Sequence, residues 1–497
     1  MNGNRSSKAN RANQANNYFI KILSLIVSLG SIASFALVLL SLIEMKVAIY
    51  NIILVAVLVD AVLVFLPFYF IASGKSVRIF ALRYGCIAIS ALMIFLNLFA
   101  SSYMALTSDF LDDQFGIEKG NIEYSVVAQR TSNIELSKQI AVRAGIQSTD
   151  SCKTEAEEQT QQIADATFME YDNLSELIDA TASDTISIAV VQSVFLVAYA
   201  EYFPESYGKL DILATFKAGT ASASGTQAVA DIDTTKPFAL YVSGVDDDGD
   251  IDQVARSDVN MLVLIDPKHY KILLVNTPRD YYVQLAGKPG LPDKLTHAGT
   301  YGIDVGEATL EDLYGINIDY HVLVNYTTLG NLVNSLGGIY VDNPQQFNLW
   351  GHDFPEGRVH LDGENAMLFC RERKHLEDGD NSRGENQQRV IEGIVAQMSA
   401  SNVVTHYKDI LAALDGTFRS NIPPSVITQL FNRQITFGGQ WTIEKISVTG
   451  TNSQQPTYSM GSDRPLSVVL PDMDSVNAAR AQMERFLRGE DDAPAAP

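Results

Sequence analysis

Three long apolar runs follow one another near the start of the chain. They span approximately Tyr18–Ile43, Val47–Ala72 and Ile79–Leu106. Each exceeds the roughly 20 residues that a helix needs to cross a bilayer, at a rise of about 1.5 Å per residue. Three successive runs without a small-residue cleavage site fit neither buried core helices nor a removable signal peptide. We therefore predict three transmembrane helices over residues 18–106.

Basic residues beside these runs indicate how they are oriented. The tail 1–17 carries three basic residues and no acid, and the second connector carries Lys75 and Arg78. Short flanks rich in Lys and Arg remain on the cytoplasmic side of a membrane. The sequence thus predicts a multi-pass protein of the cell membrane with a cytoplasmic N-terminus. All residues from about 107 onward are then extracellular.

A further uncharged stretch, Thr185–Ala200, raises the question of a fourth span. As a helix it would reach only about 24 Å, short of the roughly 30 Å hydrocarbon core. It contains Gln192, and acids flank it without basic anchors. A buried helix or strand of a soluble domain is the better interpretation.

Residues 107–235 have the pattern of a small α/β accessory domain that ends in a linker. β-Branched and alternating residues predict strands at Asn121–Gln129 and Lys138–Ala144, and a polar face of acids and glutamines predicts a helix at Thr154–Ala166. Small residues at 218–226 are typical of a linker. We find no catalytic constellation here, and a structural role is favoured over a spacer or glycan-contacting role.

From Lys236 onward, short apolar strands alternate with amphipathic helices. The expected strands are 237–244, 259–265, 271–276, 319–325 and 441–448, and the expected helices are 307–314, 326–336, 383–400, 404–415, 423–432 and 473–487. This alternation predicts a three-layer α-β-α domain over 236–487, with a central mixed sheet. We take this domain as the candidate catalytic domain. The tail 488–497 is acidic and then rich in Ala and Pro, which predicts disorder.

Charge and cysteine content exclude some classes of function. The net charge is −22 and no basic stretch occurs, so nucleic acid is not an expected partner. Three cysteines, Cys86, Cys152 and Cys370, are too few for a disulfide scaffold, and we expect them to be unpaired.

Against this acidic background, arginines gather between residues 371 and 388. Arg371 and Arg373 are two apart, so in a strand both would point to one face. Arg383 and Gln387 are four apart and would share one face of a helix that Ser382 or Asp380 caps. Arginine grips phosphate oxygens bidentately, and free helix N–H groups add to an anion site. The pattern predicts a site for phosphate or pyrophosphate.

Carboxylates at predicted strand ends suggest a metal ion beside this site. Asp246 ends one strand and Asp258 begins another, and carboxylates suit Mg²⁺ that also binds substrate phosphate. The alternative is an ordinary acidic turn at 246–248. Arg279-Asp280 follows a third strand, where side chains face a cleft, although such pairs are often surface ion pairs.

The ordered set of these motifs resembles the LytR-CpsA-Psr family of cell-envelope phosphotransferases. The resemblance is strongest over residues 237–400 and extends to 487. Its marks are Ser243–Asp246, Arg256–Asp258, Pro278–Asp280, Lys294–Ala298, Leu336–Ile339, Leu361–Ala366, Arg371–Arg373 and Gly379–Gln388. The three predicted membrane helices and the accessory domain resemble the capsule-associated branch of that family.

The resemblance implies a donor, an acceptor and roles for individual residues. The donor is a glycopolymer (capsular polysaccharide, teichoic acid or similar) on a polyprenyl-pyrophosphate carrier, and the acceptor is peptidoglycan. Asp246 and Asp258 would hold Mg²⁺ or Mn²⁺, and Asp380 would orient the arginines or act on the acceptor proton. The residues implied to clamp the pyrophosphate are Arg279, Arg371, Arg373 and Arg383, with Lys294 and Gln387 assisting. A lipid tunnel would be lined by Leu329, Leu332, Val333 and Leu336, for which ordinary core packing is the favoured alternative.

One position departs from the family pattern Arg-x-x-Arg-Gln-Gln, because Asn386 replaces the second arginine. The lost charge keeps a second hypothesis open, a non-catalytic regulator or scaffold that binds lipid pyrophosphate. Hydrolysis of the pyrophosphate, with water as acceptor, is a third possibility at the same site and is expected only as a side activity.

Overall fold

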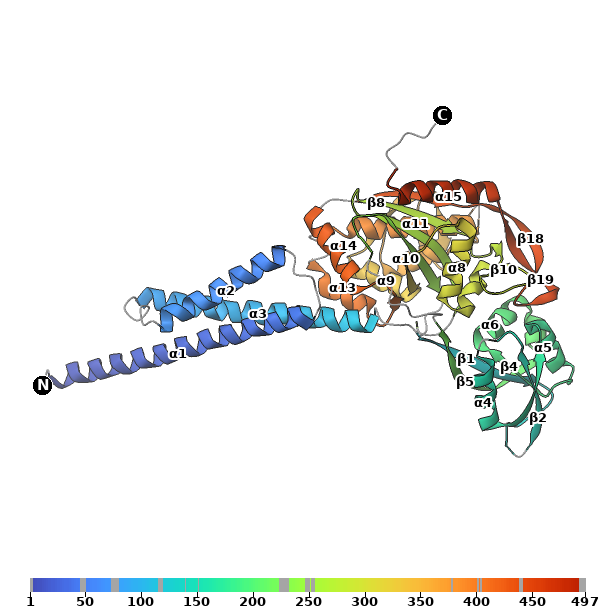
Figure 1. The fold of residues 1–497 in the computed structure, drawn as a ribbon, viewed down its shortest axis with the longest axis horizontal. Coiled ribbons are helices and arrows are strands. Elements are labelled where there is room, and N and C mark those ends of the chain that lie inside the picture. Colours follow the sequence, from blue (N-terminus) through green and yellow to red (C-terminus); the bar gives the residue numbers. More distant parts are fainter. Residues whose placement is uncertain are drawn as a thin grey trace. The chain divides into compact units, whose positions relative to one another are not determined.

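The computed structural model describes residues 3–44, 51–72, 80–114, 119–222, 232–376 and 379–490, apart from short gaps at 139, 151, 246–250, 252–254, 400–401, 403–404 and 438–440. The chain divides into two compact units, Met1–Asp113 and Gln114–Pro497 (Figure 1). Lys75 and Arg78, the linker from residue 223 and the tail from residue 491 lie outside the described residues.

The N-terminal unit consists of three helices, α1 (Gly3–Glu44), α2 (Asn51–Ala72) and α3 (Phe80–Gln114). Among the described residues, Tyr18–Leu42 in α1 and Tyr84–Ala105 in α3 are long and apolar enough to cross a membrane. The apolar stretch described in α2, Leu54–Tyr69, is shorter. Two of the predicted spans therefore have matching helices, and the span at Val47–Ala72 stays a prediction.

The accessory domain is built on a five-stranded mixed sheet in the order β3-β2-β4-β1-β5. Its strands are β1 (Lys119–Gln129), β2 (Ala141–Gln147), β3 (Asp165–Tyr171), β4 (Ile188–Gln192) and β5 (Leu210–Ser222). Its helices are α4 (Lys153–Ile163), α5 (Leu174–Ala182), α6 (Ser193–Tyr202) and α7 (Pro204–Tyr207). The stretch Thr185–Ala200 forms the fully buried β4 and most of α6, so it is a strand and a short helix of the accessory domain and not one long helix.

A six-stranded sheet in the order β16-β11-β6-β7-β8-β17 forms the centre of the larger domain. The strands are β6 (Phe238–Val245), β7 (Ser257–Asp266), β8 (Lys271–Thr277), β11 (Tyr320–Asn325), β16 (Phe418–Ser420) and β17 (Thr442–Ser447). β11 pairs with β6, and β17 with β8, in parallel, whereas β7 is antiparallel to both of its neighbours. The mixed sheet predicted from the sequence is confirmed.

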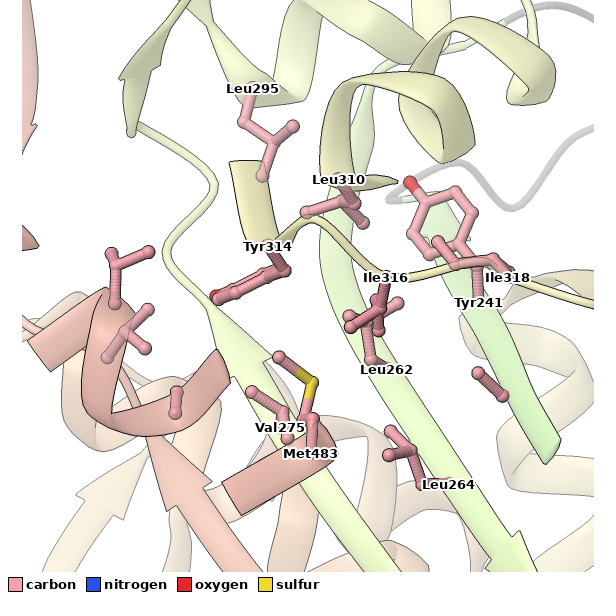
Figure 2. Close-up of a cluster of buried hydrophobic side chains, with 14 of the residues drawn as sticks. Tyr241, Leu262, Leu264, Val275, Leu295, Leu310, Tyr314, Ile316, Ile318 and Met483 are labelled. Carbon is pink, nitrogen blue, oxygen red and sulfur yellow. The ribbon is translucent and has the colours of Figure 1, made fainter. Parts of the chain in front are cut away.

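Helices cover both faces of this sheet, as three layers require. Alternate residues of β6, β7 and β8, among them Tyr241, Leu262 and Val275, pack with α8 (Ile303–Tyr314) and α15 (Met473–Leu487) (Figure 2). The intervening residues, such as Met261 and Leu274, pack on the other face beside α11 (Asp380–Gln397). α14 (Pro424–Phe437) packs near Phe238 and Tyr320. Because strand side chains alternate in direction, apolar strands of this kind need both coverings.

A third apolar cluster lies under α9 (Tyr326–Ser335), α10 (Gly363–Arg371) and α13 (Tyr407–Leu414). Two short ribbons join it, β12 (Ile339–Asn343) with β15 (Gly357–Leu361), and β13 (Phe347–Leu349) with β14 (His352–Phe354). Val333 and Leu336 are buried within this cluster, and Leu329 and Leu332 pack against it. The four residues suggested for a lipid tunnel thus pack as core residues in this structure.

A hairpin that the sequence analysis missed connects the two domains of the second unit. β18 (Gly450–Thr457) pairs with β19 (Gly461–Pro471). Met460, Leu466 and Val468 from this hairpin share a cluster of buried residues with Leu177 and Phe195 of the accessory domain. The accessory domain and the domain of the central sheet therefore have part of their cores in common.

The prediction of a strand over Arg371 and Arg373 is wrong. Asp362 caps α10 by accepting from the backbone N–H of Asn365, and the helix continues to Arg371 because Ala366, Phe369 and Cys370 fall on its buried face. Arg373 follows in irregular backbone. The capping prediction is also wrong, because α11 starts at Asp380 with Gly379 at the N-cap, where no side chain caps it.

Candidate functional site

The candidate site lies at one edge of the central sheet, where β7 begins and β8 ends. β7 is antiparallel to β8, and Asn260 is in register with Thr277. The start of β7, at Asp258, therefore lies at the same edge as Arg279, which follows β8. Asp246, the residue after β6, lies outside the described residues.

Asp258 and Arg279 form the buried centre of this site. Nη1 of Arg279 donates to Oδ2 of Asp258 at 2.8 Å, and the side chains are 10% and 4% exposed, respectively. Oγ1 of Thr296 donates to Oδ1 of the same carboxylate at 3.0 Å. Burial alone would raise the pKa of Asp258, but nearby guanidinium groups outweigh burial and lower the pKa. These groups belong to Arg279, Arg383 and Arg256.

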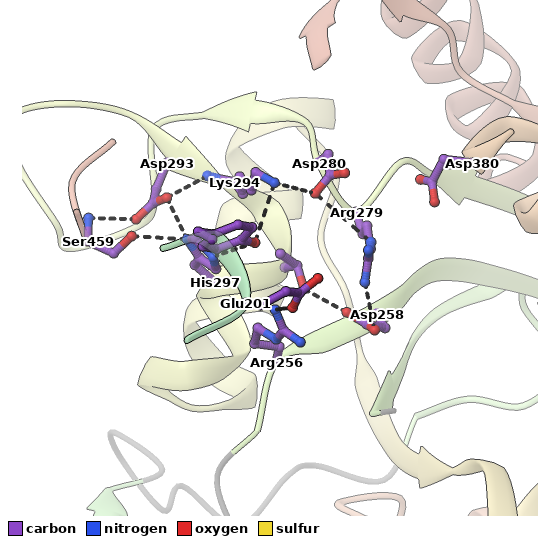
Figure 3. A network of polar contacts seen from close by, with 12 residues as sticks. Glu201, Arg256, Asp258, Arg279, Asp280, Asp293, Lys294, His297, Asp380 and Ser459 are labelled. Carbon is purple, nitrogen blue, oxygen red and sulfur yellow. Dashed lines mark hydrogen bonds and ion pairs between the residues drawn. The ribbon is translucent and has the colours of Figure 1, made fainter. Parts of the chain in front are cut away.

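Arg279 has further carboxylates around it (Figure 3). Burial acts to lower the pKa of Arg279, but the three aspartates around it outweigh burial and raise the pKa. Besides Asp258, these aspartates are Asp280 and Asp380. Within the described structure, the Nε–H of Arg279 is buried and has no hydrogen-bond acceptor. A buried donor without an acceptor requires a ligand or ordered solvent, and an oxyanion oxygen would satisfy it.

Asp380 and Arg383 share the first turn of α11. Oδ1 of Asp380 lies 2.6 Å from Nη2 of Arg383, whose side chain is 7% exposed. The same oxygen has no aligned hydrogen bond among the described residues, so the two groups are close without the geometry of one. We give more weight to the distance, because charge attraction needs no alignment. Asp380 thus holds Arg383 by charge attraction, and its Oδ1 can still accept a hydrogen bond from another donor.

The end of α10 brings Arg371 toward the same region. Its guanidinium lies over the ring of Tyr326, 4.2 Å from the centroid. Burial raises the pKa of the Cys370 thiol to about 12, while Arg371 and Arg383 act in the opposite direction. Both arginines are therefore near this thiol. The side chain of Arg373 is half-buried. It takes no part in the described ion pairs of Arg279 and Arg383.

Lys294 lies close to the charged residues around Arg279. Arg256 also belongs to this cluster, although the sequence analysis gave it no role in the site. Nζ of Lys294 lies 3.0 Å from Oδ1 of Asp280, with the side chain 5% exposed. Arg256 acts on the pKa of Asp258 and pairs with Glu201 at 2.7 Å. A signal was available, because Arg256 stands two residues before Asp258 and alternate residues of a strand share a face.

The run Asn386-Gln387-Gln388 fastens α11 to its surroundings. Nε2 of Gln387 donates to the carbonyl of Cys370 at 3.5 Å, and Nδ2 of Asn386 donates to that of Phe369 at 3.4 Å. Nε2 of Gln388 donates to backbone carbonyls of β8 and β17. Gln387 is thus bonded to protein backbone here, and its predicted part in pyrophosphate binding stays untested.

The arrangement suits an oxyanion that arrives with a countercharge. Arg279 faces Asp258, Lys294 faces Asp280 and Arg383 faces Asp380. A bound pyrophosphate would compete with these carboxylates for the cations, and a divalent cation would relieve the repulsion between the two anions.

The predicted metal pair is described only at Asp258. Both of its oxygens accept hydrogen bonds, but each carboxylate oxygen can accept more than one partner. No group of three or more His, Cys, Asp or Glu residues that could hold a metal ion occurs in the part of the chain that the structure describes. Magnesium commonly needs only one or two carboxylates beside phosphate oxygens, so Asp258 fits as one ligand.

Comparison with known proteins identifies related sequences. The sequence model of the LytR_cpsA_psr family matches residues 210–469. The polyisoprenyl-teichoic acid–peptidoglycan teichoic acid transferase TagU of Enterococcus faecalis (strain ATCC 700802 / V583) is 36% identical over 194 residues, which cover 38% of this chain and 63% of that protein. The protein of the same name from Bacillus cereus (strain AH820) is 32% identical over 204 residues, with 41% and 65% covered.

The matched part of the chain thus spans just under two thirds of the length of these relatives. Among solved structures, B. subtilis TagV is 29% identical with a TM-score of 0.44, and covers 52% of this chain and 99% of its own. B. subtilis TagU is 24% identical with a TM-score of 0.40.

Proposed function

This chain belongs to the LytR_cpsA_psr family, and from this premise we propose that it transfers a glycopolymer from a polyprenyl-pyrophosphate carrier to peptidoglycan. Two matched relatives are named as teichoic acid transferases. Teichoic acid is therefore the first polymer to test and capsular polysaccharide the second. The extracellular orientation given by the basic flanks would put the site on the side of the membrane where peptidoglycan lies.

The buried N–H of Arg279 carries this proposal. It lies among cations and carboxylates that are already held in place, and within the described structure it has no acceptor. Phosphoryl transfer asks a protein mainly for positioning and for positive charge around the phosphate oxygens. A pre-arranged arginine with an unused donor meets both needs.

In the proposed reaction, a peptidoglycan hydroxyl attacks the phosphorus next to the polymer's first sugar. The bond from that phosphorus to the bridging oxygen breaks, and polyprenyl phosphate leaves. Arg279 and Arg383 would bind the phosphate oxygens, and Asp380 would keep Arg383 oriented, as their 2.6 Å separation supports. Asp380, whose Oδ1 has no aligned hydrogen bond among the described residues, would accept the proton of the attacking hydroxyl.

Magnesium or manganese is part of the proposal. Asp258 would be one ligand and Asp246 the second. The ion would supply charge neutralisation between the pyrophosphate and the carboxylates.

A non-catalytic regulator that binds lipid pyrophosphate would use the same groups. The replacement of an arginine by Asn386 favoured this alternative. In the structure Asn386 is buried and bonds to the backbone of α10, and Arg389 donates to its side chain at 3.0 Å. A structural role at this position weakens the argument that the substitution marks lost activity.

The test uses the full chain in lipid nanodiscs with a labelled polyprenyl-pyrophosphate-linked glycan and peptidoglycan. Arg279→Ala should lower transfer of label to peptidoglycan by about 10²–10³-fold, because it removes a buried donor to a developing oxyanion. Arg373→Ala is also expected to lower transfer, because the resemblance implies that this arginine binds the pyrophosphate. Chelation of divalent cations should stop the wild-type reaction.

Arg130→Ala serves as the matched control, since Arg130 pairs with Asp211 on the surface of the accessory domain. Normal transfer by both site variants would contradict the proposal. Binding of the labelled donor by wild-type protein without any transfer or cleavage would favour the regulator instead.

A further inference from the structure

The accessory domain reaches the candidate site through the last turn of α6. Glu201 pairs with Arg256 at 2.7 Å, and Nζ of Lys294 donates to the hydroxyl of Tyr202 at 3.4 Å. The same ammonium lies 4.8 Å from the centroid of the Tyr202 ring. Lys294 and Arg256 are two of the cations near Asp258 and Asp280, so each has one carboxylate partner in the catalytic domain and one partner from the accessory domain.

Tyr202 stands in an ordered series of polar contacts between Lys294 and His297, both of which are labelled in Figure 3. Nδ1 of His297 lies 2.7 Å from the buried carboxylate of Asp293, which also accepts from the backbone N–H of Ser459. In the neutral tautomer that donates from Nδ1 to Asp293, Nε2 is an acceptor. The hydroxyl of Tyr202 lies 3.5 Å from this Nε2 and can donate to it while it accepts from Lys294.

This series of contacts sets which group donates and which accepts at each hydrogen bond. In this tautomer the hydroxyl of Tyr202 donates a hydrogen bond to Nε2 of His297, so its oxygen presents lone pairs to Lys294. The ammonium group of Lys294 can move little between Tyr202 and Asp280, because the side chain is only 5% exposed. Its neighbour Asp280 in turn lies beside Nε of Arg279.

The docking of the two domains is itself well anchored. Phe195 packs against Tyr301 with ring centroids 5.3 Å apart. Arg464 of β19 pairs with Asp179 at 2.5 Å. Because apolar core and ion pairs both cross this boundary, α6 is held firmly against the catalytic domain.

We propose that the accessory domain is part of the pyrophosphate site, with Tyr202 a positioning residue that holds Lys294 in the direction required to bind a phosphate oxygen. This inference rests on the proposed function, and it assigns to the accessory domain a role in donor binding. Tyr202 acts through Lys294, so losing either residue should cost the same interaction.

Binding of inorganic pyrophosphate to the full chain in nanodiscs tests this directly, at fixed salt and magnesium. Tyr202→Ala and Lys294→Ala should each weaken binding about tenfold, and the double variant should be no weaker than Lys294→Ala alone. Tyr202→Phe keeps the ring over the ammonium and loses only the hydroxyl, so it should be intermediate, at about threefold.

Arg130→Ala, which removes an exposed ion pair with Asp211 on the accessory domain, is the control, and its pyrophosphate affinity should equal that of wild type. Thermal unfolding shows whether each variant is folded. If Tyr202→Ala does not fold, the pyrophosphate affinity of Tyr202→Phe decides the test. Wild-type affinity in the Tyr202 variants would overturn this inference but not the proposed function. A loss of affinity of about 100-fold in the double variant, the product of the two single losses, would do the same. Failure of the wild-type chain to bind pyrophosphate would overturn the proposed function as well.

Discussion

At the scale of single residues, the site's charged side chains are held by partners and not by solvent. Arg279, Arg383 and Lys294 are each nearly buried, and each faces an aspartate. Burial of an unpaired charge is costly, so these carboxylates allow the cations to remain charged inside the protein. The binding groups are therefore in place before a ligand arrives.

Cys370 reports on this environment through its pKa. Burial raises the pKa of its thiol to about 12, above the ordinary value of 9.0, so the folded protein keeps the thiol neutral well beyond physiological pH. Because the thiolate is the nucleophile, alkylation of native Cys370 should stay slow from pH 7 to about pH 10 and rise only as the pH approaches 12. Peptide mass spectrometry after brief iodoacetamide treatment measures this rate.

The same protein in denaturant is the control, and there Cys370 should react readily above about pH 9. Fast labelling of the native thiol at pH 8 would contradict the burial and the raised pKa.

At the scale of elements, the contact between α9 and α10 decides where Arg371 lies. α10 starts at Gly363, directly against α9, and the backbone N–H of Gly363 donates to the side chain of Asn334 at 2.8 Å. A Cβ at this position would overlap the carbonyl oxygen of Gly330 and the amide of Asn334. The close approach of the two helices therefore depends on glycine.

Gly363→Ala should destabilise the catalytic domain by about 1–3 kcal/mol, because a backbone carbonyl cannot move aside as a flexible side chain can. The shift of α10 should also weaken pyrophosphate binding, since Arg371 ends that helix. Chemical denaturation followed by tryptophan fluorescence measures the first effect.

Glu364→Ala, a change at the exposed neighbouring residue, should stay within about 0.5 kcal/mol of wild type. Equal stability of Gly363→Ala and Glu364→Ala would show that α9 and α10 separate without cost.

At the scale of the whole molecule, the hairpin β18–β19 makes one folding unit of two domains. Leu466 is 3% exposed and lies in the cluster shared with the accessory domain, whereas its neighbour Ser467 is exposed. Leu466→Asp would bury a charge without a partner and should break the shared core. Calorimetry of the full chain should then resolve two thermal transitions in place of one for the residues after 114.

Ser467→Asp is the matched control, because the adjacent residue of a strand points to the opposite face. It should unfold as wild type does. A single transition in Leu466→Asp would mean that other contacts suffice to couple the domains.

Much of this architecture was predictable because it depends on local patterns. Apolar strands and amphipathic helices after Lys236 have short-range periodicity, and the three-layer domain with a mixed sheet follows from their alternation. The arginines at 371, 373 and 383 were recognisable by charge type against an acidic background. All three cysteines are buried.

The sequence by itself determined the kinds of element, the presence of apolar helices near the N-terminus and the gathering of arginines on which we base the proposed oxyanion site. Only the tertiary structure decided which residues meet there. Burial along α10 outweighed the two-residue spacing that favoured a strand at Arg371. The contacts of Arg256 with Glu201 and of Lys294 with Tyr202 join residues far apart in the chain, and no local pattern encodes them. Such contacts arise when separate apolar clusters merge, as the β18–β19 hairpin merges two here, and they bring the accessory domain to the site.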